Sequence, residues 1–180
     1  MNIPNLLSIF RIMVIPLFIF LLLPAEPDKL YVGGFIVFSL ASISDFLDGY
    51  IARKSNQITK LGKLLDPIAD KILTSAALIS LVQLQRVAAW IVVVIIAREF
   101  AVTGIRAMAA AQGQVMPADQ LGKYKMGAQI TGILMLLLDH KCLIFDWHLL
   151  GTLAIWVAMI LALVSGTQYV IRFARDMDLS

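Results

Sequence analysis

Apolar stretches of similar length recur along the chain, and short polar connectors such as 24–29 and 139–141 separate most of them. A helix that crosses a lipid bilayer needs roughly 20 mostly apolar residues. Six stretches are about this long, at 5–24, 31–52, 64–84, 88–110, 121–138 and 149–171. The pattern therefore predicts an all-α, polytopic membrane protein with six transmembrane helices, in which residues 1–180 form a single domain.

Composition indicates that lipid is the main solvent of this chain. Of the 180 residues, 60% are hydrophobic and only 15% are charged, and the mean hydropathy is +0.87. A soluble fold needs more polar surface than this. The formal net charge of +3 is too small to suggest nucleic acid as a partner. Because Cys142 is the single cysteine, an intrachain disulfide is excluded.

The distribution of Lys and Arg predicts how the spans are oriented, because cytoplasmic loops carry the excess of positive charge. Three of these cations are expected at one side, namely Lys29, Arg86 and Lys141. Nine are expected at the other side, in two connections and the tail: Arg53, Lys54, Lys60, Lys63, Arg106, Lys123, Lys125, Arg172 and Arg175. We therefore expect both termini and the regions 53–63 and 106–125 to face the cytoplasm.

Four aspartates lie inside the second and third spans. Asp45 and Asp48 are three residues apart and Asp66 and Asp70 are four apart, so each pair shares one helix face. The two spans are expected to be antiparallel neighbours. Asp45 lies eight residues before Arg53 and Asp70 lies eight residues after Gly62, which places both about 12 Å below the cytoplasmic rim. Asp48 and Asp66 share a shallower level, so the carboxylates fall at two matched depths.

Carboxylates at this depth need compensation. One Asp at the centre of a membrane helix costs roughly 2.5–3.5 kcal/mol to insert, and two divalent cations would neutralise all four charges. Oxygen-only ligand sets favour Mg²⁺ or Mn²⁺ over zinc. We therefore predict a site for two such ions at Asp45, Asp48, Asp66 and Asp70. The alternative is that the aspartates form salt bridges with the basic connection or line a polar crevice.

Two glycines and an arginine accompany the aspartates. Gly49 follows Asp48 directly and Gly62 precedes Asp66 by four residues, and glycine lets a bulky ligand approach the backbone closely. Arg53 lies one turn beyond Gly49, where it could bind a phosphate through two hydrogen bonds. The alternative role of Arg53 is to extend its charge toward the membrane surface.

Together these positions resemble the signature of the CDP-alcohol phosphatidyltransferases. Both spacings and every signature residue match. The motif reads Asp45-Phe-Leu-Asp48-Gly49-Tyr-Ile-Ala52-Arg53, and after eight further residues it continues with Gly62-x3-Asp66-x3-Asp70. The resemblance implies a six-span fold, usually a homodimer, in the cell inner (cytoplasmic) membrane, with a polar active-site cavity that faces the cytoplasm. It also implies that a CDP-linked lipid donates its phosphatidyl group to an alcohol, that CMP leaves, and that the aspartates hold two divalent metal ions.

Other segments are similar to the bacterial branch of this family that uses glycerol 3-phosphate as acceptor and forms phosphatidylglycerol phosphate. These segments are Asn2–Arg11, Ala97–Arg106 and Gly122–Lys125, while the last two spans match mainly in character. Ser8 stands where threonine is common and keeps the hydroxyl. Met126 stands where a threonine is expected, at an expected contact to the acceptor.

The resemblance also implies roles for individual residues. Asp70 is implied as the general base. CDP-diacylglycerol is implied to bind at Asn5, Ser8, Gly49, Ala52, Arg53 and Gly62. The cations left for the phosphate of glycerol 3-phosphate are Arg98, Arg106, Lys123 and Lys125. Glu99 lies near the middle of its span, and we interpret it as part of an internal salt bridge.

Other functions fit parts of this pattern. A related enzyme would take serine, inositol phosphate or a second phosphatidylglycerol as acceptor, and inositol phosphate would also need the cations around Arg106 and Lys123. A divalent-cation transporter would use the aspartates as a transit site, but it predicts carboxylates spread across the bilayer.

One structural question also stays open, because a stripe of small residues allows close helix packing either within the chain or across a dimer. The stripe is Ala154, Ala158, Ala162 and Gly166.

Overall fold

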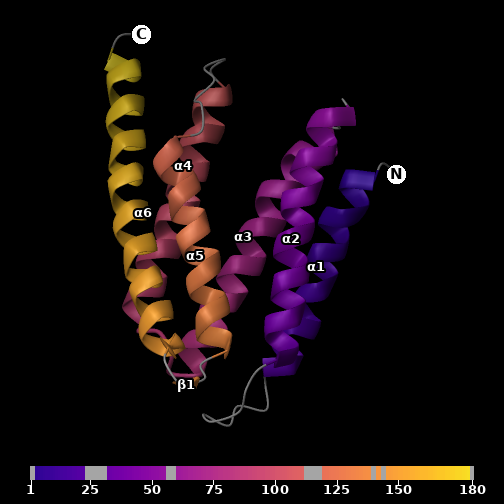
Figure 1. The fold of residues 1–180 in the computed structure, drawn as a ribbon. Coiled ribbons are helices and arrows are strands. Elements are labelled where there is room, and N and C mark those ends of the chain that lie inside the picture. Colours follow the sequence, from indigo (N-terminus) through magenta and orange to yellow (C-terminus); the bar gives the residue numbers. More distant parts are fainter. Residues whose placement is uncertain are drawn as a thin grey trace.

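Each of the six apolar stretches forms one helix in the computed structural model, which confirms the all-α fold class (Figure 1). The structure describes residues 3–22, 32–55, 60–111, 119–138, 141–142 and 145–178, without the side chains of 3–9, 45–67, 141–145 and 176–178. The helices are α1 (Ile3–Leu22), α2 (Val32–Ser55), α3 (Lys60–Gln83), α4 (Ala89–Ala111), α5 (Gln120–Leu138) and α6 (Trp147–Asp178). Between α5 and α6, strands β1 (Lys141–Cys142) and β2 (Phe145–Asp146) form a short antiparallel pair.

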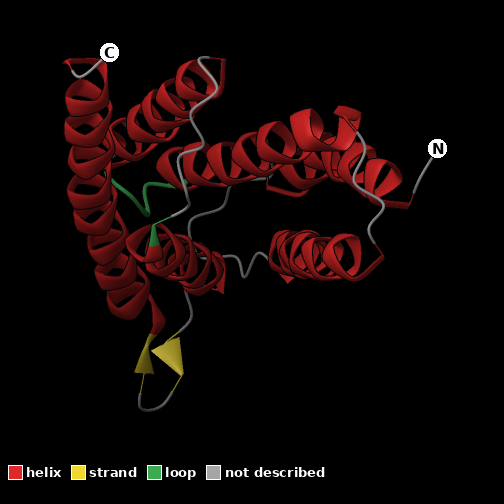
Figure 2. Ribbon diagram, turned by 90° about the horizontal axis from the view of Figure 1, so that it is seen from above, coloured by secondary structure: helices red, strands yellow, loops and turns green. Residues whose placement is uncertain are grey.

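The helices form two groups, which α3 joins through α4 and α5 and α2 joins through α5. α1 packs against α2 and α3, whereas α6 packs against α4 and α5, and α3 also contacts α4 and α5. Successive helices run in opposite directions, so α1 begins and α6 ends at the same end of the bundle (Figure 1). The strands β1 and β2 lie at the opposite end, and Figure 2 shows them outside the helices, at the beginning of α6.

The turn between α3 and α4 is held by backbone hydrogen bonds. Gln85 has a φ of 58°, the left-handed conformation in which many helices end. The N–H of Gln85 donates to Val82 O and the N–H of Arg86 to Leu81 O, each over 2.9 Å, which defines a Schellman motif. The motif brings Arg86 to the end of α5, where its Nη1 donates to Leu136 O over 2.7 Å. A cation at this position also interacts favourably with the dipole of α5.

Glycines allow α5 and α6 to approach closely. A Cβ atom at Gly151 would lie 2.7 Å from Leu136 Cγ and 3.1 Å from Leu136 N. A Cβ atom at Gly132 would lie 2.9 Å from Ile155 Cδ1. All three distances are shorter than ordinary van der Waals contacts, so these positions fix the spacing of the two helices.

The stripe of small residues on α6 packs inside the chain. Ala158 and Ala162 are buried, and α6 contacts α4 and α5. A Cβ atom at Gly166 would lie 3.0 Å from Cγ of Arg98 in α4. Of the two arrangements that the sequence leaves open, the internal one is therefore observed at these positions.

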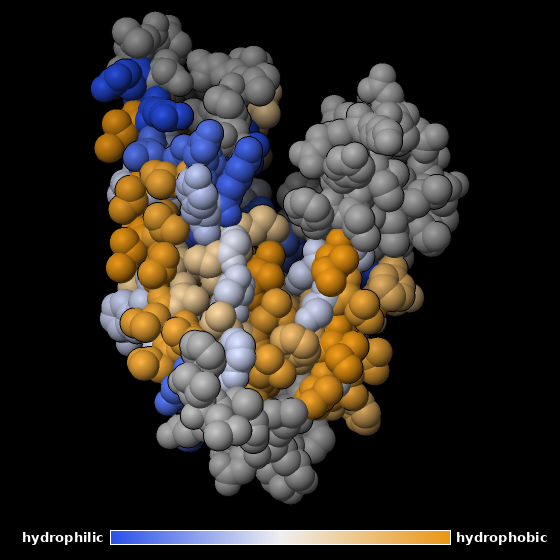
Figure 3. Space-filling model, viewed as in Figure 1, coloured by the Kyte–Doolittle hydropathy of each residue, from blue (hydrophilic) through white to orange (hydrophobic). Residues whose placement is uncertain are grey.

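Apolar side chains lie both inside and outside the bundle. Phe18 and Phe38 meet in the core, with ring centroids 5.9 Å apart. Met13, Leu40 and Val93 are 73%, 62% and 63% exposed, and Figure 3 shows hydrophobic residues over much of the described surface. Monomeric soluble proteins rarely expose contiguous apolar patches of this extent.

Within the described residues, one helix is both long and apolar enough to cross a membrane. It is α6, over Trp147–Arg175. Two shorter apolar segments lie in α1 and α2, at Phe10–Leu22 and Val32–Ser44. The prediction of six helices is thus confirmed, whereas the prediction that all six span a membrane stays a prediction.

Replacing Gly151 by alanine should destabilise the fold, because the added methyl group forces α5 and α6 apart. Overpacking of this kind typically costs about 1–3 kcal/mol, which exceeds the gain of up to about 1 kcal/mol when alanine replaces glycine in a helix. We expect Gly151→Ala to lower the midpoint of thermal unfolding in detergent.

Gly127→Ala is the matched control, because in the described part of the chain nothing beyond the local backbone of α5 lies within 4 Å of a Cβ atom at this position. Only the gain in helix propensity acts there, so the midpoint should stay the same or rise. An equal rise in both variants would contradict the close contact between α5 and α6.

Candidate active site

A pocket of about 250 Å³ lies between α3, α4, α5 and α6. Its charged and polar lining residues are Asp70, Lys71, Thr74, Arg98, Glu99, Thr103, Arg106, Asp119, Lys123, Lys125, Gln129 and Tyr169. Five of these are cations and three are carboxylates, so an anionic ligand is favoured. Figure 3 shows hydrophilic residues gathered at the upper end of the α4–α6 side, above the hydrophobic surface. The structure thus brings the predicted base and all four predicted acceptor-binding cations to one pocket.

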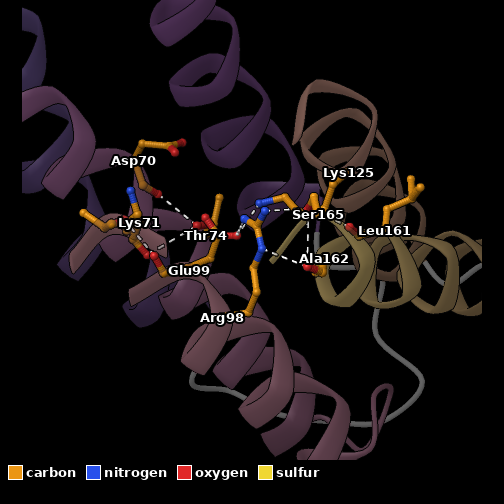
Figure 4. Close-up of polar contacts among 10 residues, drawn as sticks. Asp70, Lys71, Thr74, Arg98, Glu99, Lys125, Leu161, Ala162 and Ser165 are labelled. Atoms are coloured by element: carbon orange, nitrogen blue, oxygen red, sulfur yellow. Dashed lines mark hydrogen bonds and ion pairs between the residues drawn. The ribbon is translucent and has the colours of Figure 1, made fainter. Parts of the chain in front are cut away.

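A buried group of charges joins three helices in the pocket wall. Glu99 Oε1 in α4 accepts hydrogen bonds from Arg98 Nη1, over 2.9 Å, and from Lys125 Nζ in α5. The side chains of Arg98, Glu99 and Lys125 are 10%, 17% and 7% exposed. Arg98 also donates from Nη2 to Ser165 Oγ over 2.5 Å and from Nε to Ala162 O over 2.9 Å, both in α6 (Figure 4). The internal salt bridge predicted for Glu99 is confirmed.

The surroundings of Arg98 fix its side chain between α4 and α6. Ser165 Oγ accepts from Arg98 and donates to Leu161 O over 2.7 Å, so the hydroxyl is used in both directions. Gly166 leaves the space that the aliphatic part of Arg98 occupies. Buried charges are tolerated only when they are paired and hydrogen-bonded. Arg98 therefore holds helices together in addition to lining the pocket.

Arg106 and Lys123 differ from the buried cations. Both side chains are exposed at the pocket, and neither forms an ion pair with another residue in the described part of the chain. A dianionic ligand can bind them without breaking an existing ion pair. In the described part of the chain, Arg106 and Lys123 are thus the exposed, unpaired cations of the pocket, whereas Lys125 is paired with Glu99.

Asp70 is the member of the aspartate quartet whose side chain the structure describes. It lines the pocket, and its backbone carbonyl accepts a hydrogen bond from Thr74 Oγ1 over 2.9 Å (Figure 4). The side chains of Asp45, Asp48 and Asp66, on α2 and α3, lie outside the described part. Among the side chains that are described, no three His, Cys, Asp or Glu residues cluster as metal ligands would. The two-metal site stays a prediction.

The residues expected to bind CDP-diacylglycerol lie on three helices that pack together through α1. Their side chains lie outside the described part, so their role also stays a prediction. They are Asn5 and Ser8 on α1, Gly49, Ala52 and Arg53 on α2, and Gly62 on α3.

The structure gives a place to polar residues that the sequence alone does not single out. Gln129 and Ser165 are polar residues inside apolar stretches, a pattern that often marks a functional position. The N–H of Asp119 donates to Tyr169 Oη over 3.0 Å. Since 50 residues separate these two positions, no local pattern indicates the contact.

A sequence profile described as CDP-alcohol phosphatidyltransferase matches residues 1–164, and the chain belongs to this family. The resemblance seen in the aspartate signature is therefore confirmed. Among its relatives is a CDP-diacylglycerol–glycerol-3-phosphate 3-phosphatidyltransferase of Bacillus subtilis (strain 168). The two sequences are 45% identical in an alignment 179 positions long, and the alignment covers 93% of each chain. Proteins of the same name from Rickettsia felis and Pseudomonas fluorescens are 40% and 37% identical, over 93% and 94% of this chain and 93% and 88% of their own.

Glu99→Gln should destabilise the protein strongly, because Arg98 and Lys125 then remain buried without a counter-charge. Removing one partner of a buried ion pair costs about 3–5 kcal/mol. We expect a lower midpoint of thermal unfolding in detergent. The double variant Glu99→Gln/Lys125→Met should lose less than the two single variants together, since it also removes one of the uncompensated charges.

Asp146→Asn is the control, since it makes the same carboxylate-to-amide change at an exposed position. Asp146 Oδ1 accepts a hydrogen bond from Leu149 N over 3.1 Å at the start of α6, and asparagine caps helices about as well as aspartate. If Glu99→Gln were as stable as this control, the ion-pair group would have no structural role.

Proposed function

We propose that this chain transfers the phosphatidyl group of CDP-diacylglycerol to glycerol 3-phosphate, which yields phosphatidylglycerol phosphate and CMP. The observation that carries the proposal is a single pocket that holds Asp70 together with Arg106 and Lys123. A phosphorylated alcohol needs a base near its hydroxyl and cations near its phosphate. The names of the relatives, at up to 45% identity, support the same activity.

In the proposed reaction, the primary hydroxyl oxygen of glycerol 3-phosphate attacks the phosphorus that carries the diacylglycerol. The new P–O bond forms as the P–O bond to CMP breaks, and the hydroxyl proton passes to the Asp70 carboxylate. Arg106 and Lys123 bind the acceptor phosphate through charge-assisted hydrogen bonds, and the buried charges of Arg98 and Lys125 assist them. Fixing both substrates in one orientation supplies much of the acceleration.

The donor is proposed to bind on the α1–α3 side of the pocket. Gly49, Ala52, Arg53 and Gly62 would enclose the cytidine and the phosphates, with Asn5 and Ser8 closing one side. Support comes from the signature spacing on α2 and α3, since glycine permits close approach to the backbone and arginine binds phosphate through two hydrogen bonds. α3 also supplies Asp70 to the pocket, which puts the donor side next to the acceptor side.

The four aspartates suit two Mg²⁺ or Mn²⁺ ions, because carboxylates offer only oxygen ligands and four of them balance two divalent charges. Asp45, Asp48, Asp66 and Asp70 would hold the ions. Bound there, such ions stabilise the negative charge that develops on a pyrophosphate. The position of Asp70 in the pocket wall supports this assignment.

We place all six helices across the cell inner membrane, with both termini and the pocket facing the cytoplasm. Support comes from large apolar side chains exposed along the bundle and from the cations near the pocket end, as the positive-inside rule requires. Membrane lipid then covers the apolar surface. That the chain forms a homodimer rests on the family resemblance alone.

Two other functions remain as alternatives. An enzyme that accepts inositol phosphate would use the same cations, but the names of the relatives favour glycerol 3-phosphate. A divalent-cation transporter is disfavoured by the spacing of the aspartates, which the sequence clusters near one side instead of across the bilayer, and it leaves Gly49, Arg53 and Gly62 unexplained.

The purified protein should release CMP from CDP-diacylglycerol with glycerol 3-phosphate as acceptor, and not with serine, inositol phosphate or phosphatidylglycerol. Because the donor pyrophosphate needs charge compensation, a chelator should abolish the release, and Mg²⁺ or Mn²⁺ should restore it. CMP is measured in detergent micelles with each acceptor in turn. Release with inositol phosphate alone would favour the alternative enzyme.

Asp66→Asn tests the metal ligands within the same assay, because it removes one carboxylate charge and nearly preserves the side-chain shape. The variant should fold and show almost no activity. A folded Asp66→Asn protein that is fully active in metal-free buffer would overturn the two-metal site.

Arg106→Ala and Lys123→Ala should each raise the KM for glycerol 3-phosphate and leave the KM for CDP-diacylglycerol nearly unchanged. Losing a charge-assisted hydrogen bond costs roughly 1.5–3 kcal/mol, which is about a ten- to hundredfold effect. The loss appears in KM if the phosphate is bound equally in the ground and transition states.

Arg172→Ala is the matched control, an exposed cation of α6 that does not line the pocket. It should change neither KM. If Arg106→Ala and Lys123→Ala behaved like this control, or raised both KM values equally, the two residues would not be the acceptor-binding pair.

A further inference from the structure

Gln129 of α5 is a buried amide whose carbonyl oxygen has no hydrogen-bond partner among the residues that the structure describes. The residue is 4% exposed, and Oε1 is enclosed without a donor. Gln129 also lines the pocket, four residues after Lys125 and therefore on the same face of α5. Native proteins leave few buried polar atoms unpaired. An unpaired amide oxygen in a pocket wall thus points to a ligand that supplies the donor.

The other neutral polar side chains of the described pocket lining already form hydrogen bonds. Thr74 Oγ1 and Thr103 Oγ1 each donate to the carbonyl oxygen four residues earlier in the same helix, over 2.9 and 2.7 Å. Tyr169 Oη accepts the N–H of Asp119 over 3.0 Å. Among these neutral side chains, Gln129 is therefore the one with a buried polar atom that has no partner in the described part of the chain.

The proposed acceptor carries a group that suits this amide. Between its phosphate and its reacting primary hydroxyl, glycerol 3-phosphate has a secondary hydroxyl, which both donates and accepts hydrogen bonds. A side-chain amide also does both, whereas Lys and Arg only donate and an ionised carboxylate only accepts. We propose that Gln129 binds the secondary hydroxyl of the acceptor and thereby selects glycerol 3-phosphate over phosphorylated alcohols that lack it. The inference rests on the proposed function.

The test compares two acceptors with two proteins. Wild type and Gln129→Met are assayed with glycerol 3-phosphate and with 3-hydroxypropyl phosphate, the same molecule without the secondary hydroxyl. Methionine nearly matches glutamine in size and forms no comparable hydrogen bond. Wild type should favour glycerol 3-phosphate in kcat/KM by about five- to a hundredfold, and Gln129→Met should lose this preference while keeping its KM for CDP-diacylglycerol.

Gln83→Met is the control, because Gln83 is an exposed amide at the end of α3, away from the pocket lining. It should keep the wild-type preference. Should Gln129→Met not fold, Gln129→Asn replaces it, and the shortened amide should lower the preference as well.

Three results would count against the inference or its basis. Equal losses with both acceptors in Gln129→Met would make the residue a packing element and overturn the inference. A wild type that uses both acceptors equally well would overturn it without any variant. A wild type that releases no CMP with either acceptor, but does so with serine or inositol phosphate, would refute the proposed function instead.

Discussion

The carboxylate of Glu99 is the charge on which the α4–α6 half of the bundle depends. It neutralises Arg98 on its own helix and Lys125 on α5, and Arg98 then reaches α6 through Ser165 and Ala162 O. Two cations at this depth would otherwise repel each other and lose their hydration without compensation. One buried acid therefore lets three helices meet around a polar pocket while their outer faces remain apolar.

The cations of the pocket also differ in how deeply they are buried. From the sequence, Arg98, Arg106, Lys123 and Lys125 form one set, because they are the cations left for the acceptor phosphate once Arg53 is assigned to the donor, with Arg98 deeper in its span than the other three. The structure separates them, since Arg98 and Lys125 are buried in ion pairs and Arg106 and Lys123 are exposed. Charge that is already paired inside the protein gains less from a ligand than charge that faces solvent. This difference is why the exposed pair is the one proposed to bind the phosphate of the acceptor.

The helices could be predicted because a long apolar stretch indicates a helix that is buried in lipid or protein. The residues at which the helices end could not be predicted in the same way. α2 continues to Ser55 where the apolar stretch stops at 52, and α6 continues to Asp178 beyond 171, because charged residues such as Arg53 and Arg172 end an apolar run without breaking a helix. The pairing of Glu99 followed from the cost of an isolated buried charge. The contact of Asp119 with Tyr169 and the pocket position of Gln129 depend on how distant helices pack, which no local pattern records.

α3 lies between the two groups of helices, which α2 also connects through its contact with α5. It packs against α1 on one side and against α4 and α5 on the other. It also carries Gly62, Asp66 and Asp70 of the family signature, and the last of these lines the pocket that Arg106 and Lys123 share. If the donor is held by the signature and the acceptor by the α4–α5 cations, the reacting atoms meet along α3. The register of α3 against α4 and α5 then sets the distance between hydroxyl and phosphorus, and holding two bound substrates at such a fixed distance supplies much of an enzyme's acceleration.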